Sequence, residues 1–139
     1  RAGSDIKVSM QLGTPRVWVE ADPLLLEQAV SNVARNAMDW AQRGEFSPQI
    51  RVQLHIDTQN ETPHVGIVIG DNGPGVPDSE LATIFNAFHT NKPEGMGMGL
   101  AICRSVIEAH HGHITVARDP TLGGAQFTLW LPLDNHPHN

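Results

Sequence analysis

The chain has 139 residues, a formal net charge of −6 and 40% hydrophobic residues. This length is enough for one domain with a hydrophobic core, and the acidic balance argues against a nucleic-acid-binding surface. No run of about 18 apolar residues occurs, so no segment of the sequence is expected to span a membrane.

The chain begins at Arg1 with neither a methionine nor a signal peptide, so we expect a single domain over residues 1–139, cut from a longer protein. The single Cys103 excludes an internal disulfide, and its apolar neighbours predict a buried thiol. His110, His111 and His113 lie close together, but neither a cysteine nor a carboxylate stands at ligand spacing. A structural or solvated role is therefore favoured for these histidines.

The N-terminal segment predicts two strands and the start of a helix. Residues 6–10 and 17–20 alternate between apolar and polar positions, and the Gly-Thr-Pro turn between them predicts a hairpin. Asp22 and Pro23 then mark a helix start, with the aspartate as N-cap and the proline in the first helical position.

A long amphipathic helix is predicted from about Pro23 to Arg43. Its apolar residues recur at helical spacing and should face the core: Leu26, Ala29, Val30, Val33, Ala37 and Ala41. A second stripe carries Gln28, Asn32, Asn36, Asp39 and Arg43. This stripe is either the solvated side of the helix or, because asparagine is a poor helix former, a surface that hydrogen-bonds something else.

Two further strands are predicted over residues 50–56 and 65–69. The second is apolar almost throughout, which favours a central place in a sheet. It runs into the loop Gly70-Asp71-Asn72-Gly73-Pro74-Gly75. An aspartate just past a central strand, followed by a Gly/Pro loop, is typical of a ligand site, but Asp-Asn-Gly also makes ordinary turns.

Residues 78–85 predict a short helix. Phe85 and Phe88 are three residues apart and should both pack on the core. A polar link over residues 89–94 follows, in which Lys92 is the only cation.

The run Gly95-Met96-Gly97-Met98-Gly99-Leu100 precedes the last predicted helix, which extends from Gly99 to about His110 and is ended by Gly112. Glycines before a helix allow a close backbone approach to a ligand, and the free N–H groups of a helix start suit phosphate. The glycine spacing is not that of a dinucleotide-binding fingerprint, and no G-K-[ST] follows, so a P-loop is excluded.

Residues 114–116 and 125–131 predict the last two strands, the second with Phe127, Leu129 and Leu131 on one face. Because hairpins dominate the order of elements, we predict an α+β fold built as a two-layer sandwich. Its sheet should be mixed, mainly antiparallel and of about five strands, with the helices on one face.

Five motifs occur in order along residues 6–132. They are Asn-x-x-x-Asn-Ala on the long helix, Asp-x-Gly-x-Gly after a strand, a Phe-containing segment, Gly-x-Gly-x-Gly before a helix and Gly-Gly-Ala-x-Phe before the last strand. This order closely resembles the ATP-binding catalytic domain of sensor histidine kinases, in the superfamily shared with gyrase, the heat-shock chaperone and mismatch-repair ATPases. The resemblance implies a Bergerat-type fold that binds ATP and Mg²⁺.

The resemblance assigns catalytic roles to two asparagines. Asn36 matches the residue that ligates Mg²⁺ through its amide oxygen, a hard ligand suited to this cation. Asn32 stands where the hydrolysing relatives carry a glutamate that activates water. Because an amide cannot act as a general base, phosphoryl transfer to a separate nucleophile fits better than hydrolysis.

The resemblance also implies a nucleotide-binding set. Asp71 matches the carboxylate that accepts a hydrogen bond from the adenine amino group, which favours adenine over guanine. Lys92 is implied to reach the outer phosphates and so joins the catalytic set, with a solvated lysine as the alternative. The other implied contacts come from glycines beside the base and from the glycine run: Gly73, Gly75, Gly95, Gly97, Met98, Gly99 and Leu100.

Three residues depart from the commoner pattern of that family. Asp39 stands where some kinases carry a basic residue, and Asn91 replaces a commoner threonine. His111 occupies a position where the family often has glycine, so the turn there is expected to differ. None of the three belongs to the main motifs.

The implied function is that of the catalytic domain of a two-component sensor histidine kinase. It would transfer the γ-phosphoryl group of ATP to a histidine on a dimerisation domain that this chain lacks. The isolated chain should be monomeric and bind ATP without autophosphorylation. The longer protein would be a homodimer with this portion in the cytoplasm, and its further partner would be the receiver domain of a response regulator.

Two alternatives remain from the sequence. One is an ATP-hydrolysing relative of the gyrase or chaperone type, which a glutamate at position 32 would have supported. The other is a non-catalytic module that senses nucleotide or docks to protein.

Overall fold

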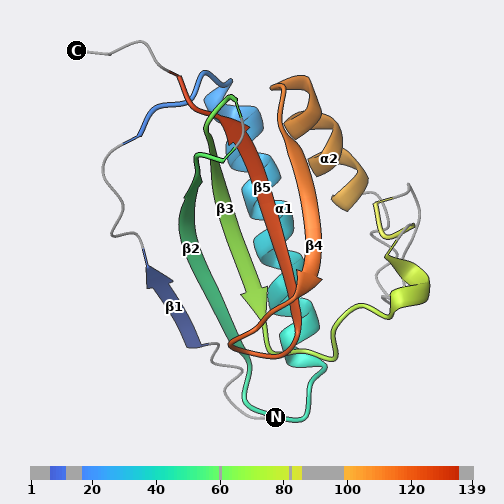
Figure 1. The fold of residues 1–139 in the computed structure, drawn as a ribbon. Coiled ribbons are helices and arrows are strands. Elements are labelled where there is room, and N and C mark those ends of the chain that lie inside the picture. The colour runs from blue at the N-terminus through green and yellow to red at the C-terminus, as the bar shows by residue number, and fades with distance from the viewer. Residues whose placement is uncertain (1–6, 12–16, 60, 82, 86–98, 135–139) are drawn as a thin grey trace.

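The computed structural model describes residues 7–11, 17–59, 61–81, 83–85 and 99–134. One sheet of five strands forms a layer, and the helices α1 and α2 cover one of its faces (Figure 1). The predicted α+β sandwich is therefore confirmed. Within the described residues, no helix is both long and apolar enough to cross a membrane.

The elements follow one another as β1 (Lys7–Gln11), α1 (Pro23–Gln42), β2 (Gln49–Asp57), β3 (His64–Asp71), the 3-10 helix η1 (Asp78–Glu80), α2 (Gly99–Ala109), β4 (His113–Arg118) and β5 (Ala125–Pro132). In space the strand order is β1-β2-β3-β5-β4, which places the apolar β3 at the centre, as predicted. Neighbouring strands are antiparallel except for β1 and β2, which are parallel.

The predicted N-terminal hairpin is wrong. β1 pairs with β2, and residues 17–20 form neither helix nor strand. The alternation in this segment reflects burial, because Val17 and Val19 pack against the core while Trp18 is exposed. In a half-buried segment, apolar and polar residues can alternate as they do in a strand. The pattern therefore predicted correctly which residues are buried, but it predicted the wrong strand pairing.

Helix α1 begins and packs as its sequence predicts. The Asp22 carboxylate accepts hydrogen bonds from the backbone N–H groups of Leu24 and Leu25, at 3.0 and 3.1 Å, and Pro23 opens the first turn. The buried side of the helix carries mostly small side chains: Ala29, Val33, Ala37 and Ala41. Small residues at a contact allow the helix to lie close to the sheet.

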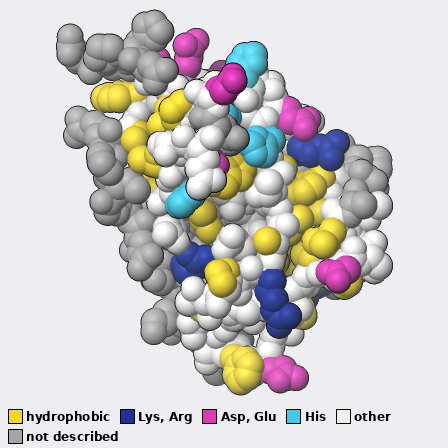
Figure 2. Space-filling view, viewed as in Figure 1, with side chains coloured by type: hydrophobic (Ala, Val, Ile, Leu, Met, Phe, Trp, Pro, Cys, Tyr) yellow, Lys and Arg dark blue, Asp and Glu magenta, His cyan; other side chains and the backbone are white. Residues whose placement is uncertain are grey.

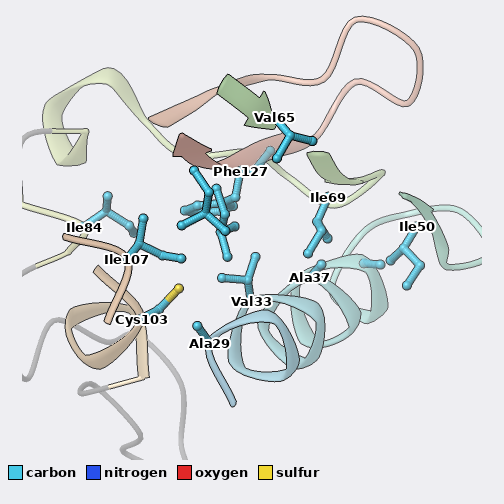
Figure 3. Packing of buried hydrophobic residues seen from close by; sticks show 14 residues of the cluster. Ala29, Val33, Ala37, Ile50, Val65, Ile69, Ile84, Cys103, Ile107 and Phe127 are labelled. Carbon is cyan, nitrogen blue, oxygen red and sulfur yellow. The ribbon is translucent and has the colours of Figure 1, made fainter. Parts of the chain in front are cut away.

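The core lies between the two helices and the inner face of the sheet. In Figure 3, Val33 from α1 and Ile107 from α2 point toward Phe127 on β5. Cys103 is fully buried in this cluster, as predicted, and burial raises the pKa of its thiol to about 12. Phe85 packs edge-to-face on Phe127 with ring centroids 5.9 Å apart, which confirms the prediction for Phe85.

The helix predicted over residues 78–85 is wrong in extent. Only the 3-10 turn η1 forms, and no side-chain hydrogen bond caps it. The described residues that follow are turns. A helix this short gains little from its own hydrogen bonds, and without a cap nothing local favours a longer one.

The end of α2 differs from the prediction that Gly112 ends the helix. The left-handed residue is His111, with φ of 66°, and Gly112 donates its N–H to the carbonyl of Ile107 at 2.9 Å. Gly112 is needed for space, because a Cβ there would lie 1.9 Å from the carbonyl oxygen of Trp130. The expected difference at His111 is thus a left-handed turn made by a non-glycine residue.

Candidate functional site

The carboxylate of Asp71 lies at the end of the central strand β3 and is fully buried. Its Oδ1 accepts hydrogen bonds from the N–H groups of Gly73, at 2.8 Å, and Ala125, at 3.2 Å. Its Oδ2 is buried without a hydrogen-bond partner among the described residues. A buried carboxylate oxygen without a donor is costly, so this atom is the clearest candidate to receive a ligand.

Burial also changes the acidity of this group. Desolvation raises the pKa of Asp71 from 3.8 to about 6, against the opposing effect of the hydrogen bonds from Gly73 and Ala125. The nearby carboxylate of Asp119 raises this pKa further. At neutral pH, Asp71 is therefore still an ionised acceptor, held where its charge is poorly solvated.

Glycines allow the loops to close around this carboxylate. A Cβ on Gly124 would lie 2.3 Å from Asp71 Oδ1, and a Cβ on Gly73 would lie 2.3 Å from the carbonyl oxygen of Trp40. Gly75 has a φ of +84°, a conformation that only glycine adopts without strain. Of the glycines in the motifs predicted from the sequence, Gly73 and Gly124 thus lie directly beside Asp71.

Asn36 is the one residue of the polar stripe on α1 that is buried, with 8% of its surface exposed. Its Nδ2 has no hydrogen-bond partner among the described residues, and Asn32, one turn earlier, is half-buried. Rotating the amide by half a turn exchanges nitrogen and oxygen, so Asn36 can present either a donor or an acceptor. The stripe is therefore not simply the solvated side of the helix.

Trp40 is a residue that the sequence reasoning missed. It lies one turn after Asn36, its Nε1 is buried without a described partner, and the Arg43 guanidinium lies 5.4 Å from its ring centroid. In the described part of the chain, three buried side-chain polar atoms lack a hydrogen-bond partner, and they belong to Asn36, Trp40 and Asp71. The sequence did contain a signal for Trp40, because an indole four residues after Asn36 lies on the same side of the helix as that asparagine.

A pocket of about 170 Å³ opens beside the loop that follows Asp71. Its lining comes from that loop, from η1 and from the β4–β5 turn: Pro74, Gly75, Val76, Asp78, Leu81, Ala117, Arg118, Gly123 and Gly124. A larger pocket of about 690 Å³ includes Asp22, His110 and Pro132. Pro132 pairs with His64 at the opposite end of β3, so the larger pocket lies away from Asp71 and contains none of the predicted site residues.

The phosphate side of the predicted set is only partly described. Gly99 and Leu100 begin α2, and among the described residues no atom beyond its chain neighbours and its own helix turn lies within 4 Å of a Cβ built on Gly99. The remaining predicted residues lie outside the described residues: Phe88, Lys92, Gly95, Gly97 and Met98. The described residues contain no group of three or more His, Cys, Asp or Glu side chains that could hold a metal ion.

Comparison with known families shows which family the chain belongs to. Residues 21–135 match the family of histidine kinase-, DNA gyrase B- and HSP90-like ATPases, and the chain belongs to that family. It is the ATP-binding catalytic domain of the sensor histidine kinase type, as its sequence and structural neighbours agree.

Among curated proteins, the C4-dicarboxylate transport sensor protein DctS of Rhodobacter capsulatus is 39% identical over 116 residues, which are 83% of this chain and 17% of that protein. The sensor histidine kinase TmoS of Ectopseudomonas mendocina is 36% identical over 116 residues, which are 83% of this chain and 12% of TmoS. The chain thus spans less than a fifth of the length of these relatives.

Among solved structures, the mycobacterial sensor histidine kinase MprB superposes with a TM-score of 0.78 at 32% identity, covering 94% of this chain and 85% of that one. The ATP-binding domain of PrrB from Mycobacterium tuberculosis gives a TM-score of 0.72 at 27% identity, covering 94% and 82%.

Proposed function

We propose that this chain binds Mg²⁺-ATP and directs its γ-phosphoryl group to a histidine on a separate dimerisation domain. The receiver domain of a response regulator would then take the phosphoryl group from that histidine. ATP supply and the two-component role favour a cytoplasmic position for this domain. By itself the ATP-binding domain would bind ATP without phosphorylating itself, because the proposed acceptor histidine lies on a separate domain.

The observation that carries this proposal is that Asp71 Oδ2 is buried without a hydrogen-bond partner among the described residues. It is a buried, ionised acceptor, and the amino group of adenine is a donor that would satisfy it. Guanine would present a carbonyl oxygen to the same atom and leave two acceptors facing each other. The site therefore fits adenine nucleotides better than guanine nucleotides.

The buried amide of Asn36 would supply a neutral oxygen ligand for Mg²⁺, and the phosphates would supply anionic ones. Bound Mg²⁺ would neutralise charge that develops on the transferred group. Asn32 has no basicity, so it can orient a group by hydrogen bonding and cannot deprotonate water. This pair of amides favours transfer to a better-placed nucleophile over hydrolysis.

The other end of the nucleotide would meet the glycine run. Backbone N–H groups at a helix start suit phosphate, and no atom of the described residues outside that helix turn crowds the start of α2 at Gly99. Lys92 would add a positive charge toward the outer phosphates.

Calorimetry and a hydrolysis assay together test this function. The chain should bind Mg²⁺-ATP at one site without sustained turnover, and Asn36→Ala should weaken the Mg²⁺-dependent part of binding by about tenfold. Gln28→Ala is the matched control, since Gln28 is exposed on the same helix. Steady-state ATP hydrolysis that Asn36→Ala abolishes would instead identify a hydrolase.

A further inference from the structure

A second buried carboxylate lies on the other face of the sheet, behind Asp71. Asp119 follows β4, and its side chain is fully buried. Its Oδ2 accepts hydrogen bonds from the Arg51 guanidinium, from Nη2 at 3.0 Å and from Nε at 3.3 Å. Arg51 also donates to the side-chain oxygens of Gln53 and Gln126, so the guanidinium is held on several sides.

The sheet register explains this location. Arg51 on β2, Gly70 on β3 and Gln126 on β5 are direct neighbours in one row across the sheet. Neighbours in such a row point to the same face, which here is the face without helices. Gly70 leaves the gap in this row, and a Cβ there would lie 1.7 Å from Asp119 Oδ2.

Asp119 also organises the β4–β5 turn. Its Oδ1 accepts hydrogen bonds from the N–H groups of Thr121, at 2.8 Å, and Leu122, at 2.7 Å. Its backbone N–H donates to the carbonyl of Gly124 at 2.8 Å, and its carbonyl accepts from Gly123 at 2.9 Å. In Figure 1 this turn crosses the end of the sheet where β3 finishes.

The same turn carries groups that hold Asp71. The N–H of Gly124 donates to the Asp71 carbonyl oxygen at 3.0 Å, and the N–H of Ala125 donates to Asp71 Oδ1. Asp119 therefore connects Arg51 on β2, through the turn, to the donors that orient the Asp71 side chain.

We infer that Asp119 is a positioning residue for nucleobase recognition: its ion pair with Arg51 anchors the β4–β5 turn and so fixes the free oxygen of Asp71 toward the adenine amino group. This inference rests on the proposed role of Asp71. It assigns to Asp119 and Arg51 part of the selectivity for adenine, although neither residue is placed against the nucleotide.

The test compares ATP with purine riboside triphosphate, which lacks the amino group, by calorimetry at pH 8. At this pH Asp71, with its pKa of about 6, is ionised. Asp119→Asn keeps an oxygen for the turn but removes the charge that pairs with Arg51. We expect this variant to lower the ratio of the affinity for ATP to the affinity for purine riboside triphosphate by about tenfold, chiefly by weakening the binding of ATP.

Glu108→Gln is the matched control, because it removes one charge from the exposed Arg104–Glu108 pair and should leave the ratio unchanged. The inference is overturned if Asp119→Asn folds and its affinity ratio stays within about twofold of the wild-type ratio. It is also overturned if the variant binds both nucleotides more weakly by the same factor. If wild-type chain does not discriminate between the nucleotides, the role of Asp71 itself fails instead.

Folding of each variant is checked by its amide NMR spectrum. If Asp119→Asn does not fold, the double variant Arg51→Gln/Asp119→Asn takes its place, since it leaves no uncompensated buried charge. It should show the same fall in the affinity ratio. Failure of both variants to fold would assign the ion pair to stability alone and overturn the positioning role.

Discussion

Two buried carboxylates lie at the same end of the sheet and differ in almost every other respect. Asp119, on the face without helices, has a guanidinium partner for one oxygen and two backbone donors for the other. Asp71 has two backbone donors on one oxygen and no described partner on the second. Within the described part of the chain, no positively charged side chain pairs with Asp71, and the charged group that shifts its pKa is the like charge of Asp119.

The contrast separates Asp119, whose oxygens are paired and help build the fold, from Asp71, which we propose binds a ligand. A buried ion is tolerated when its hydrogen bonds are complete and a counter-charge is present, which is the state of Asp119. Asp71 meets neither condition, and its pKa is raised as a result. At neutral pH, where Asp71 is ionised, binding of a donor would remove that penalty, which supports the proposed role of Asp71 in binding.

The face without helices adds a further difference. Histidine side chains gather over part of this face in Figure 2, and His113 stacks on Trp130 with ring centroids 6.1 Å apart. Trp130 in turn donates from Nε1 to Thr115 Oγ1 at 3.1 Å. The indole N–H of Trp130 thus has a partner on this face, as the carboxylate oxygens of Asp119 do.

Removal of the counter-charge of Asp119 should have the largest effect on stability. Arg51→Gln leaves Asp119 buried and uncompensated, and we expect the free energy of unfolding to fall by about 3 kcal/mol. Urea unfolding measures this loss. Arg104→Gln, which breaks the exposed pair at 3.8 Å, should cost less than about 0.5 kcal/mol; equal losses in the two variants would contradict the role given to the buried pair.

The acidity of Asp71 predicts a pH dependence of smaller size. Its pKa is higher in the folded state, about 6, than the ordinary value of 3.8, so the folded state binds the proton more tightly. The stability that the folded chain gains from protonated Asp71 is complete below the unfolded pKa of 3.8. It is lost as pH rises through the folded pKa of about 6. Relative to Asp71→Asn, the wild type should lose about 2 kcal/mol of stability between pH 4.5 and 7.5.

Urea unfolding of both proteins across this pH range measures that difference. Because the two chains share every other titratable group, their comparison isolates the contribution of Asp71. Parallel stability curves for wild type and Asp71→Asn would show that the carboxylate is not held in the poorly solvated state described above.

A crowded glycine beside Asp71 offers a third and smaller test. A methyl group at Gly124 would lie 2.3 Å from Asp71 Oδ1, so Gly124→Ala must displace the carboxylate or the turn. We expect ATP affinity to fall by about tenfold and stability to fall by about 1–2 kcal/mol.

Gly99→Ala serves as the stability control, since the structure leaves open space at that position. Its free energy of unfolding should stay within about 1 kcal/mol of the wild type. Unchanged ATP affinity in Gly124→Ala, measured by calorimetry, would mean that the turn can move without disturbing the base site.

Local sequence patterns predicted the helices and strands well, and the reason is physical. Periodicity reports burial, so the core stripe of α1 and the central place of β3 could be read directly. Periodicity does not report which strand pairs with which. β1 pairs with β2, where Lys7 lies opposite Gln49, 42 residues later in the chain. It does not pair with the segment that directly follows it.

The site divides in the same way. Asn36 and Asp71 could be singled out from the sequence as candidates because their residue types are unusual where they stand, on a helix stripe and after an apolar strand. Asp119 could not, because its partner Arg51 is 68 residues away and only the sheet register brings them together. The one local signal was an aspartate before Pro-Thr, a common turn former.

The most direct test of the central claim is calorimetry of Asp71→Asn with Mg²⁺-ATP at pH 7.5. Asparagine can still accept from Gly73 and Ala125, so the variant should fold, but it would turn an amide donor toward the adenine amino group. We predict that ATP affinity falls by roughly 50-fold or more. Wild-type affinity in the folded variant would contradict the claim that the free oxygen of Asp71 reads the base.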